Sequence, residues 1–252
     1  MYTHRDHAPL ARAYPAEGRP DPLRQAGIDG VLGQSWEDEN GAIAATGFFT
    51  FLLGAPAPGD ETARILQSLA FGCFIPESEA WLALLGSMPH TSYTRCKMAP
   101  PAQFDKEKLR ALITALPAPF SIRPIDAPML EAGIVTEEEL NIPHCFGSRD
   151  NYLRTGFGFA AMDGGRTVSV VSTYIVHGGE AEVDISTDEA YRRRGLAAAV
   201  CARFVLECLS RGLTPSWDAQ NTGSVRLAEK LGFTLDRAYE AYVLTARKED
   251  DA

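Results

Sequence analysis

The sequence predicts a mixed α/β (α+β) fold, in which a sheet is flanked by helices. Three observations lead to this prediction. The second half of the chain alternates between strand and helix periodicity, in the order strand, helix, strand, helix, strand. Two alternating segments before it bracket Asp163-Gly164-Gly165, which is a strong hairpin signal. Between residues 190 and 211, apolar residues such as Leu196 and Val200 recur every four positions, which indicates a helix packed on a sheet.

The individual elements follow from the same periodicities. Strands are predicted at residues 42–53, 71–75, 91–98, 120–125, 158–162, 167–175, 180–187, 215–219 and 238–245. Helices are predicted at 60–70, 105–116, 190–211 and 222–231, with another opened by Pro76. Thr136 to Glu139 fits a capping box, the signature of a helix start. Roughly the first 35 residues are rich in proline, glycine and charge, so we expect an irregular lead-in.

Paired prolines at Pro117-Ala118-Pro119 mark the best candidate for a domain boundary, because proline resists both helix and central strand. The sequence therefore predicts two domains. Residues 1–118 form a smaller N-terminal α/β domain, and residues 119–252 form a second domain that holds the motifs described below.

Composition restricts the classes of function. A net charge of −9 argues against nucleic acid as a partner, which requires a basic face. No apolar run is long enough to span a bilayer, and the N-terminus lacks the layout of a signal peptide, so we expect a cytoplasmic protein without a membrane partner. The five cysteines are odd in number and form no CxxC pair, so we expect neither a disulfide framework nor a metal site.

The segment from Glu180 to Ala197 carries the clearest chemical signal. A strand with alternating apolar and polar residues runs through a loop with three arginines into a helix, with Gly195 at the turn. Such a turn aims free backbone N–H groups and the positive end of the helix at a bound anion. The pattern predicts a pyrophosphate cradle without the lysine of a P-loop. The alternative is a solvated arginine loop, since charge at a helix start is common.

This pattern resembles a known family. Arg192-x-x-Gly195-x-Ala197, placed between a strand and a helix, is similar to the acyl-CoA signature of the GNAT (Gcn5-related) N-acetyltransferase superfamily. The segment from Asn221 to Gly232-Phe233 resembles the second motif of that superfamily, and the resemblance covers residues 119–245. Residues 48–54 and 75–81 resemble a two-part GNAT group. A GNAT-type, mostly antiparallel sheet would then follow an N-terminal domain of related, degenerate shape.

The resemblance implies acyl transfer from acetyl-CoA, or another acyl-CoA, to an amine of a small molecule or peptide, without a metal. Three groups of coenzyme-binding residues are implied. Ile185, Ser186 and Thr187 would line the pantetheine arm. The pyrophosphate would lie at the segment comprising Arg192, Arg193, Arg194, Gly195, Leu196 and Ala197. Asn221 would meet the pantetheine amide or the acceptor, and Ser224 would lie near the phosphates or the thiol.

The catalytic groups of the superfamily are matched less completely in this sequence than its coenzyme-binding motifs. Glu182 is the first candidate for a general base and Asp184 the second. The alternative is that these alternating acidic residues simply form the solvent-exposed face of the strand. The tyrosine that often serves as general acid in this superfamily is replaced by Ala228, a departure that puts efficient amine acetylation in doubt. Tyr239 is the substitute candidate on the last strand, with Tyr242, Ser224 or a water as further possibilities.

Two other classes of function stay open. The protein could be a non-catalytic acyl-CoA-binding sensor, which the alanine at position 228 favours. It could also take its acyl group from acyl carrier protein or aminoacyl-tRNA, although the net negative charge of the chain argues against binding of tRNA. The sequence leaves the acceptor unnamed and a homodimer open.

Overall fold

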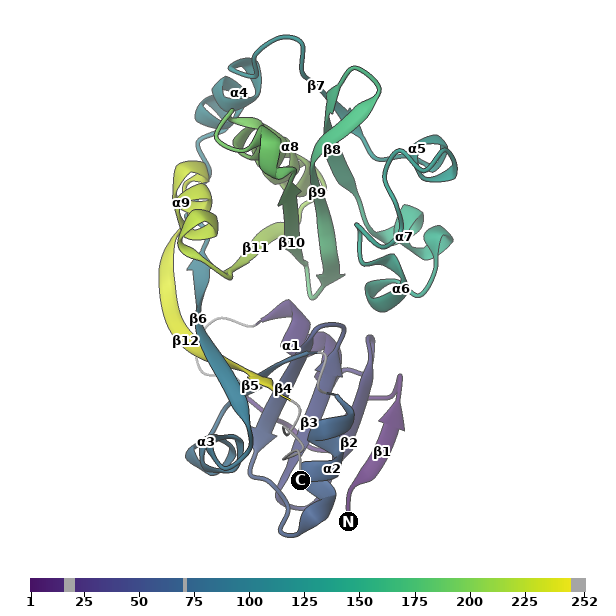
Figure 1. Ribbon diagram of the computed structural model, residues 1–252, viewed down its shortest axis with the longest axis vertical. Coiled ribbons are helices and arrows are strands. Elements are labelled where there is room, and N and C mark those ends of the chain that lie inside the picture. The colour runs from purple at the N-terminus through teal and green to yellow at the C-terminus, as the bar shows by residue number, and fades with distance from the viewer. Residues whose placement is uncertain (16–20, 70–71, 246–252) are drawn as a thin grey trace, which may run out of the picture. The chain divides into compact units, whose positions relative to one another are not determined.

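A computed structural model describes residues 1–15, 21–69 and 72–245 of the chain (Figure 1). The chain packs into two compact units. The first unit comprises Met1–Arg95 and the C-terminal segment from Tyr239, and the second comprises Cys96–Ala238. Two long strands, β6 (His90–Ala99) and β12 (Thr234–Leu244), run from one unit into the other.

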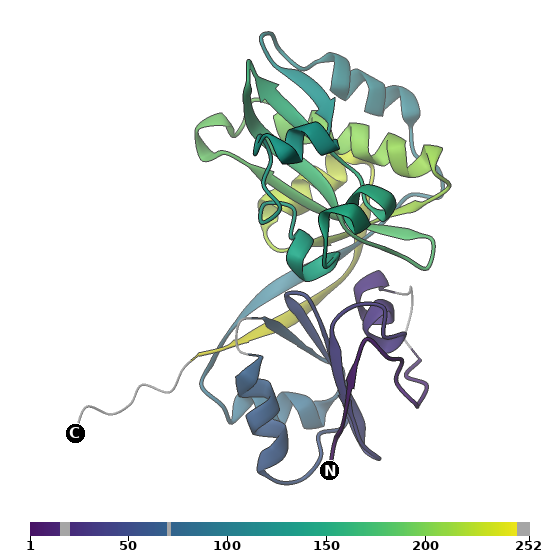
Figure 2. The same cartoon turned by 90° about the vertical axis from the view of Figure 1, so that its right-hand side faces the viewer.

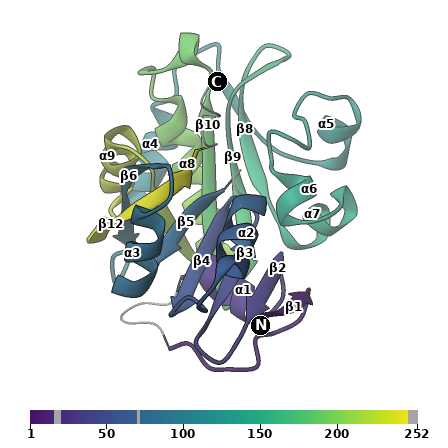
Figure 3. The ribbon, with the colours of Figure 1, turned by 60° about the horizontal axis from the view of Figure 1, so that its bottom comes forward.

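The first unit contains a sheet in the order β1-β2-β3-β4-β5-β12, whose first five strands lie side by side in Figure 3. The neighbouring strands are antiparallel except for the pair β4 and β5, which is parallel. The elements of this unit are β1 (Thr3–Asp6), α1 (Pro22–Ile28), β2 (Gln34–Glu37), β3 (Gly41–Thr46), β4 (Phe49–Gly54), α2 (Asp60–Ser68), β5 (Cys73–Pro76) and α3 (Glu79–Gly86).

Helices cover both faces of this first sheet. Helix α1 lies so close to β3 that a Cβ on Gly27 would meet the Thr46 side chain at 2.7 Å. On the other face, α2 and α3 supply Leu66 and Trp81 to an apolar core with Phe74 of β5. Alternation along β3, with Ile43 in this core and its neighbour facing α1, explains how six buried residues in a row can form one strand.

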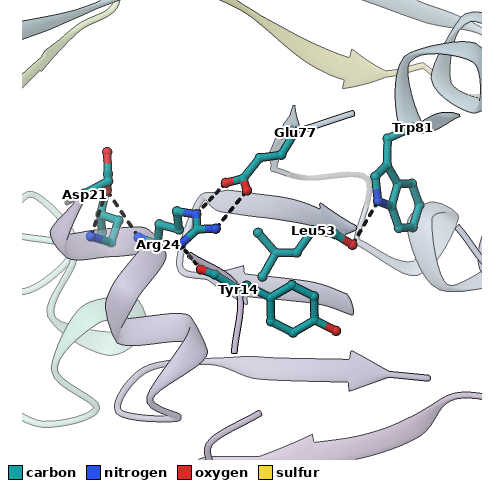
Figure 4. A network of polar contacts seen from close by, with 7 residues as sticks. Tyr14, Asp21, Arg24, Leu53, Glu77 and Trp81 are labelled. Atoms are coloured by element: carbon teal, nitrogen blue, oxygen red, sulfur yellow. Dashed lines mark hydrogen bonds and ion pairs between the residues drawn. The ribbon is translucent and has the colours of Figure 1, made fainter. Parts of the chain in front are cut away.

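The predicted irregular lead-in was wrong for the described residues, because β1, α1 and the start of β2 fall within it. Helix α1 has only seven residues, so hydrophobic periodicity could not reveal it. A polar network stabilises it instead (Figure 4). Asp21 caps the helix by accepting from the Arg24 backbone N–H at 3.2 Å, and the Arg24 guanidinium donates to both carboxylate oxygens of Glu77 at 2.5 and 2.8 Å and to the Tyr14 carbonyl.

The second unit contains a sheet in the order β7-β8-β9-β10-β11-β6, antiparallel except for the pair β10 and β11. Its elements are α4 (Lys106–Thr114), β7 (Ser121–Pro124), α5 (Ala127–Glu131), α6 (Ile142–Cys145), α7 (Arg149–Thr155), β8 (Gly158–Asp163), β9 (Arg166–His177), β10 (Glu180–Thr187), a 3₁₀ turn (Glu189–Tyr191), α8 (Leu196–Ser210), β11 (Thr214–Ala219) and α9 (Thr222–Leu231).

Helix α8 is the centre of this second unit. Its buried face, which includes Leu196, Val200 and Phe204, packs on β8 to β11 and, at its edges, on α4 and α9. Helices α5 to α7 cover the other face, where the Tyr152 hydroxyl of α7 lies 3.0 Å from the Ser172 hydroxyl of β9. Figures 1 and 2 show the two groups of helices on opposite sides of β8 and β9. The sheet is thus a layer between two sets of helices.

The two units share one order of elements. Each runs strand, helical segment, three-stranded meander, helix, strand, helix, strand, and each has a parallel pair on either side of the helix that follows the meander. Their last strands are exchanged: β6 follows α3 but pairs with β11, whereas β12 follows α9 but pairs with β5. The sequence shows no repeat of fixed period, so the likeness lies in topology.

The predicted α/β class with a mostly antiparallel sheet is confirmed, as is the hairpin at Gly164-Gly165. The capping box at Thr136 and Glu139 forms both of its hydrogen bonds, at 3.2 and 2.8 Å, but it closes a turn and the helix begins only at Ile142. The prolines at 117–119 lie within the second unit. The division into residues 1–118 and 119–252 stays a prediction, because packing units and inherited domains need not share a boundary.

Candidate coenzyme and acyl-transfer site

The parallel strands β10 and β11 separate halfway along. They pair from Glu180 with Thr214 to Glu182 with Ser216, and the described residues show no further pairing between them. β10 nevertheless stays paired with β9 as far as Thr187. Every second backbone N–H and C=O of β10 beyond Glu182 therefore faces an open edge. Ile185, Ser186 and Thr187, the predicted pantetheine residues, all lie on this edge.

The loop after β10 turns its backbone through two left-handed residues. Arg193 has φ +62°, which is uncommon for a residue with a Cβ, and Gly195 has φ +84° as the N-cap of α8. No side chain among the described residues caps this helix. Its first-turn N–H groups, including those of Leu196 and Ala197, consequently remain as donors at the positive end of a 15-residue helix. A Cβ built on Gly195 would meet nothing within 4 Å, so the space above the turn is open.

The arginine side chains brace this loop. Arg192 donates from Nε to the Thr187 carbonyl at 3.4 Å, and Arg194 donates from Nη2 to the Ala190 carbonyl at 3.1 Å. The Arg194 guanidinium also lies over the Tyr191 ring, 5.0 Å from its centroid. The arginines thus hold the loop in a shape that presents backbone amides, and their positive charge adds to that of the helix end.

The second predicted motif lies at the start of α9. The side-chain oxygen of Asn221 caps the helix by accepting from the Ser224 N–H at 3.0 Å. The Ser224 hydroxyl accepts a hydrogen bond from the indole Nε1 of buried Trp217, also at 3.0 Å. Asn221 therefore caps α9 and Ser224 joins α9 to β11, and their contacts with a coenzyme stay predictions. Ala228 is fully buried in the apolar core.

Glu182 forms a buried ion pair. Its carboxylate oxygen lies 3.1 Å from the ammonium of Lys97 on β6, and both side chains are 4% exposed. Lys97 pairs in register with Asp218 of β11, while Glu182 pairs with Ser216 of the same strand. The ion pair therefore bridges β10 and β6 at the point where β10 and β11 part.

Asp184 lies two residues further along β10, on the same face. Asn141, which precedes α6 in a left-handed conformation, donates from Nδ2 to the Asp184 carboxylate at 2.8 Å. Burial raises the pKa of Asp184 above its usual value, while the hydrogen bond from Asn141 and that from the Ile185 backbone act in the opposite direction. Burial also raises the pKa of the nearby Cys145 thiol, to about 12, so this cysteine is a neutral neighbour.

The sequence missed Lys97 and Asn141 as members of this site. Lys97 lies on a strand that is far from Glu182 in sequence. As a charged residue between Cys96 and Met98, it fits the ordinary alternation of polar and apolar residues along a strand, so nothing in the sequence marks it as part of the site. Asn141 lay in a segment without a motif. Tyr239 and Tyr242, the predicted substitutes for the general acid, belong to the first unit, and the role of Tyr239 stays a prediction.

A polar cavity of about 450 Å³ lies beside the end of β10. Ser169, Ser186 and Thr187 line it together with the ion-paired side chains of Arg166 and Asp188. The Ser169 hydroxyl donates to the Ser186 carbonyl at 3.0 Å, which fixes the strand end. Within the described ranges, no group of three or more His, Cys, Asp or Glu residues is placed to hold a metal ion, and no helix is long and apolar enough to cross a membrane.

Comparison with known proteins decides the family. The model of the GNAT acetyltransferase family matches residues 17–242. The chain belongs to this family. A GCN5-related N-acetyltransferase-like protein from Streptococcus suis is 31% identical, and its structure matches with a TM-score of 0.80 over 90% of this chain and 94% of that one. The protein is therefore an acyltransferase of the GNAT type.

Two further relatives are consistent with this family. An uncharacterized N-acetyltransferase from Bacillus subtilis, YdfB, is 39% identical over 99 residues, which cover 38% of this chain and only 38% of that protein. A GCN5-related N-acetyltransferase from Kribbella flavida shares the fold, with a TM-score of 0.57 at 14% identity over 90% of this chain and 95% of that one. The GNAT-type fold predicted from the two motifs is thus confirmed.

Proposed function

We propose that this GNAT protein transfers an acetyl group from acetyl-CoA to an amine of a small molecule or peptide. The observation that carries the proposal is the continuity of the site. The open edge of β10 begins directly after Glu182 and leads along Ile185 to Thr187 into the amide cradle at Gly195. An extended chain with amide groups can pair with such an edge, while its pyrophosphate accepts from the cradle.

The coenzyme would be held mainly by backbone groups. The edge at Ile185, Ser186 and Thr187 would pair with the pantetheine amides, and the N–H groups from Arg193 to Ala197 would bind the pyrophosphate. Arg192 and Arg194 would contribute charge and hold the loop. Asn221 and Ser224 would border the coenzyme from the α9 side, in addition to the structural bonds that they already make.

In the reaction, the acceptor nitrogen attacks the thioester carbon, a C–N bond forms and the C–S bond breaks. An acceptor that arrives as an ammonium must first lose a proton to a base. We favour Asp184 for this step, because Glu182 is already paired with Lys97, whereas burial raises the pKa of Asp184 towards the range in which a carboxylate is an effective base. The nitrogen loses a second proton to water as the amide forms, and the departing thiolate takes up a proton from water, since Ala228 has no acidic group.

Only the second unit is proposed to bind the coenzyme, although the first unit has the same order of elements. In the first unit, β4 and β5 stay paired from Phe49 with Cys73 to Leu52 with Pro76, so no edge opens. The helix that follows begins with Asp60 and Glu61, whose charges oppose a phosphate. We therefore expect one coenzyme per chain, a stoichiometry that titration calorimetry measures.

The direct test follows free thiol release while the protein is incubated with acetyl-CoA and a panel of amines. Thiol release that depends on one acceptor supports the proposal. Binding of one acetyl-CoA per chain without release for any acceptor would favour the sensor function. No binding of acetyl-CoA would point to another acyl carrier, such as acyl carrier protein or aminoacyl-tRNA.

The choice of base is tested by Asp184→Asn against Glu182→Gln. We expect Asp184→Asn to lower kcat by about 100-fold or more, a typical contribution of general base catalysis. Because burial raises the folded-state pKa of Asp184, its charge opposes folding increasingly as pH rises above the unfolded value of about 4. Asp184→Asn should therefore also be more stable than the wild type at pH 7, with the difference vanishing near pH 4. A larger loss of kcat in Glu182→Gln would assign the base to Glu182.

A further inference from the structure

Asn141 brings an amide donor from the segment before α6 to the Asp184 carboxylate on β10. Its Nδ2 donates to Oδ2 of Asp184 at 2.8 Å, which is short enough for a hydrogen bond to a charged oxygen. Burial is the largest influence on the pKa of Asp184 and raises it, while the bonds from Asn141 and from the Ile185 backbone lower it. The donor therefore replaces part of the hydration that a buried carboxylate loses.

The main chain around Asn141 holds this amide in place. Asn141 has φ 52° and ψ 26°, in the left-handed region. Its N–H donates to the Glu138 carbonyl at 3.1 Å, and its carbonyl accepts from the Cys145 N–H at 2.9 Å. The capping box between Thr136 and Glu139 closes the turn directly before it. The amide is thus presented to β10 from a main chain that is hydrogen-bonded on both sides.

Asparagine satisfies two demands at position 141. A residue with a Cβ rarely holds a left-handed conformation, and asparagine is one of the few that do so readily. Glycine would hold the turn without a donor, and most side chains that donate would strain the turn. Asparagine both tolerates the backbone and supplies a neutral donor, so the residue type matches a position that must orient a carboxylate.

We propose that Asn141 is a positioning residue that orients the Asp184 carboxylate and keeps it charged, ready to accept the acceptor's proton. A protonated carboxyl group cannot act as a base, so a donor that favours the charged form extends catalysis to lower pH. The catalytic consequence rests on the proposed function, whereas the effect on the charge of Asp184 does not. The capping box predicted from the sequence thereby gains a role in the site, because its turn leads to Asn141.

The elements packed around Asp184 carry other ionisable groups, which set the value from which variants at position 141 depart. They are the thiol of Cys145 on α6, the phenols of Tyr152 on α7 and Tyr174 on β9, the carboxylate of Glu182 on β10 with the ammonium of Lys97 on β6, and the carboxylate of Asp218 on β11. The Cys145 thiol is neutral, since burial raises its pKa to about 12. All these groups are kept in each variant, so a difference between variants reports the side chain at position 141.

Two variants separate the amide from the backbone, with one acceptor at saturation so that its own ionisation is common to all. Asn141→Leu keeps the volume but removes the donor, and it should move the acid limb of the kcat–pH profile upward by about one pH unit. Asn141→Gln strains the left-handed turn as leucine does but keeps an amide, so the limb should move less than about half as far.

An upward shift in Asn141→Leu that Asn141→Gln does not share supports the proposal. An unchanged limb in Asn141→Leu would overturn it, and so would equal shifts in both variants, which strain in the turn would explain. Asn141→Gly holds the turn without a side chain and provides a folded protein should Asn141→Leu unfold. Its limb should also move upward, by a smaller amount, because water can take the place of the missing amide.

The carboxyl ¹³C chemical shift of Asp184, followed against pH in the free proteins, measures the same shifts without turnover. If the wild type transfers no acyl group, the proposed function fails, and this titration still decides whether Asn141 keeps Asp184 charged. If the titration moves in Asn141→Leu while the acid limb of kcat stays in place, Asp184 is not the base, and the positioning role of Asn141 in the reaction is refuted.

Discussion

The backbone cradle at the start of α8 can be tested by replacing Gly195 with valine. Gly195 has φ +84°, and a residue with a Cβ holds this left-handed conformation at a cost of about 1–2 kcal/mol, with β-branched residues at the upper end. Valine would either hold the turn at this cost or release it into an ordinary conformation. In the second case the N–H groups of the turn no longer converge on a phosphate.

The expected loss of affinity follows from the hydrogen bonds involved. A hydrogen bond to a charged group contributes about 1.5–3 kcal/mol, so losing two of them weakens binding by about 3–6 kcal/mol. That is a 100-fold or larger rise in Kd, at about 1.4 kcal/mol for each tenfold change. The exposed Arg193 side chain, by contrast, contributes a screened surface charge of about 1 kcal/mol or less, so Arg193→Ala should raise Kd less than about tenfold.

The measurement is titration calorimetry with coenzyme A for both variants. Gly212→Val is the matched control, because Gly212 follows the other end of α8, has φ +71° and likewise has nothing within 4 Å of a built Cβ. It should destabilise the fold by a similar amount and leave Kd unchanged. If Arg193→Ala weakens binding more than Gly195→Val, or if Gly212→Val weakens it as much, the backbone account of the cradle is refuted.

Two further substitutions test the α9 side of the site. Ser224→Ala removes the acceptor of the buried Trp217 indole N–H and should lower the free energy of unfolding by about 1–3 kcal/mol in denaturant titrations, whereas the exposed Ser210→Ala should be near neutral. Ala228→Tyr, which restores the residue usual in this superfamily, should destabilise the protein by about 1–3 kcal/mol or more, because Ala228 is fully buried in the apolar core. A gain in kcat from that tyrosine would contradict this account.

Sequence reasoning located the second unit well because its elements are long and periodic. The strand Glu180–Thr187 and the helix Thr222–Leu231 begin and end where their patterns predict. The helix expected from residue 190 begins only at Leu196, since the arginine loop has a helical composition but two left-handed residues, which periodicity cannot detect. The family resemblance, not the periodicity, supplied the predicted coenzyme residues, which lie in two local motifs, one around Gly195 and one around Asn221.

The sequence ranks Glu182 before Asp184 as the candidate base, but it carries no information on the distant partners that distinguish the two carboxylates in the fold. Glu182 and Asp184 occupy equivalent positions in an alternating strand. Lys97, 85 residues earlier, and Asn141, 43 residues earlier, distinguish them in the folded protein. Contacts of this separation leave no trace in local periodicity, and they determine which carboxylate is paired with a cation and which is buried with a neutral amide as donor.

The first unit shows which features of the cradle matter. Like α8, its helix α2 follows the third strand of a meander and begins after a glycine with positive φ and no side-chain cap, Gly59. A glycine-capped helix start is therefore common to both units and does not by itself make a coenzyme site. What differs is the opening between the parallel strands and the charge of the first turn. Replacing Asp60 and Glu61 with alanine removes the negative charge of the first turn but leaves β4 and β5 paired. Titration with the coenzyme should therefore still show one site per chain. A second site would mean that the charge of the first turn, and not the separation of the strands, selects the binding unit.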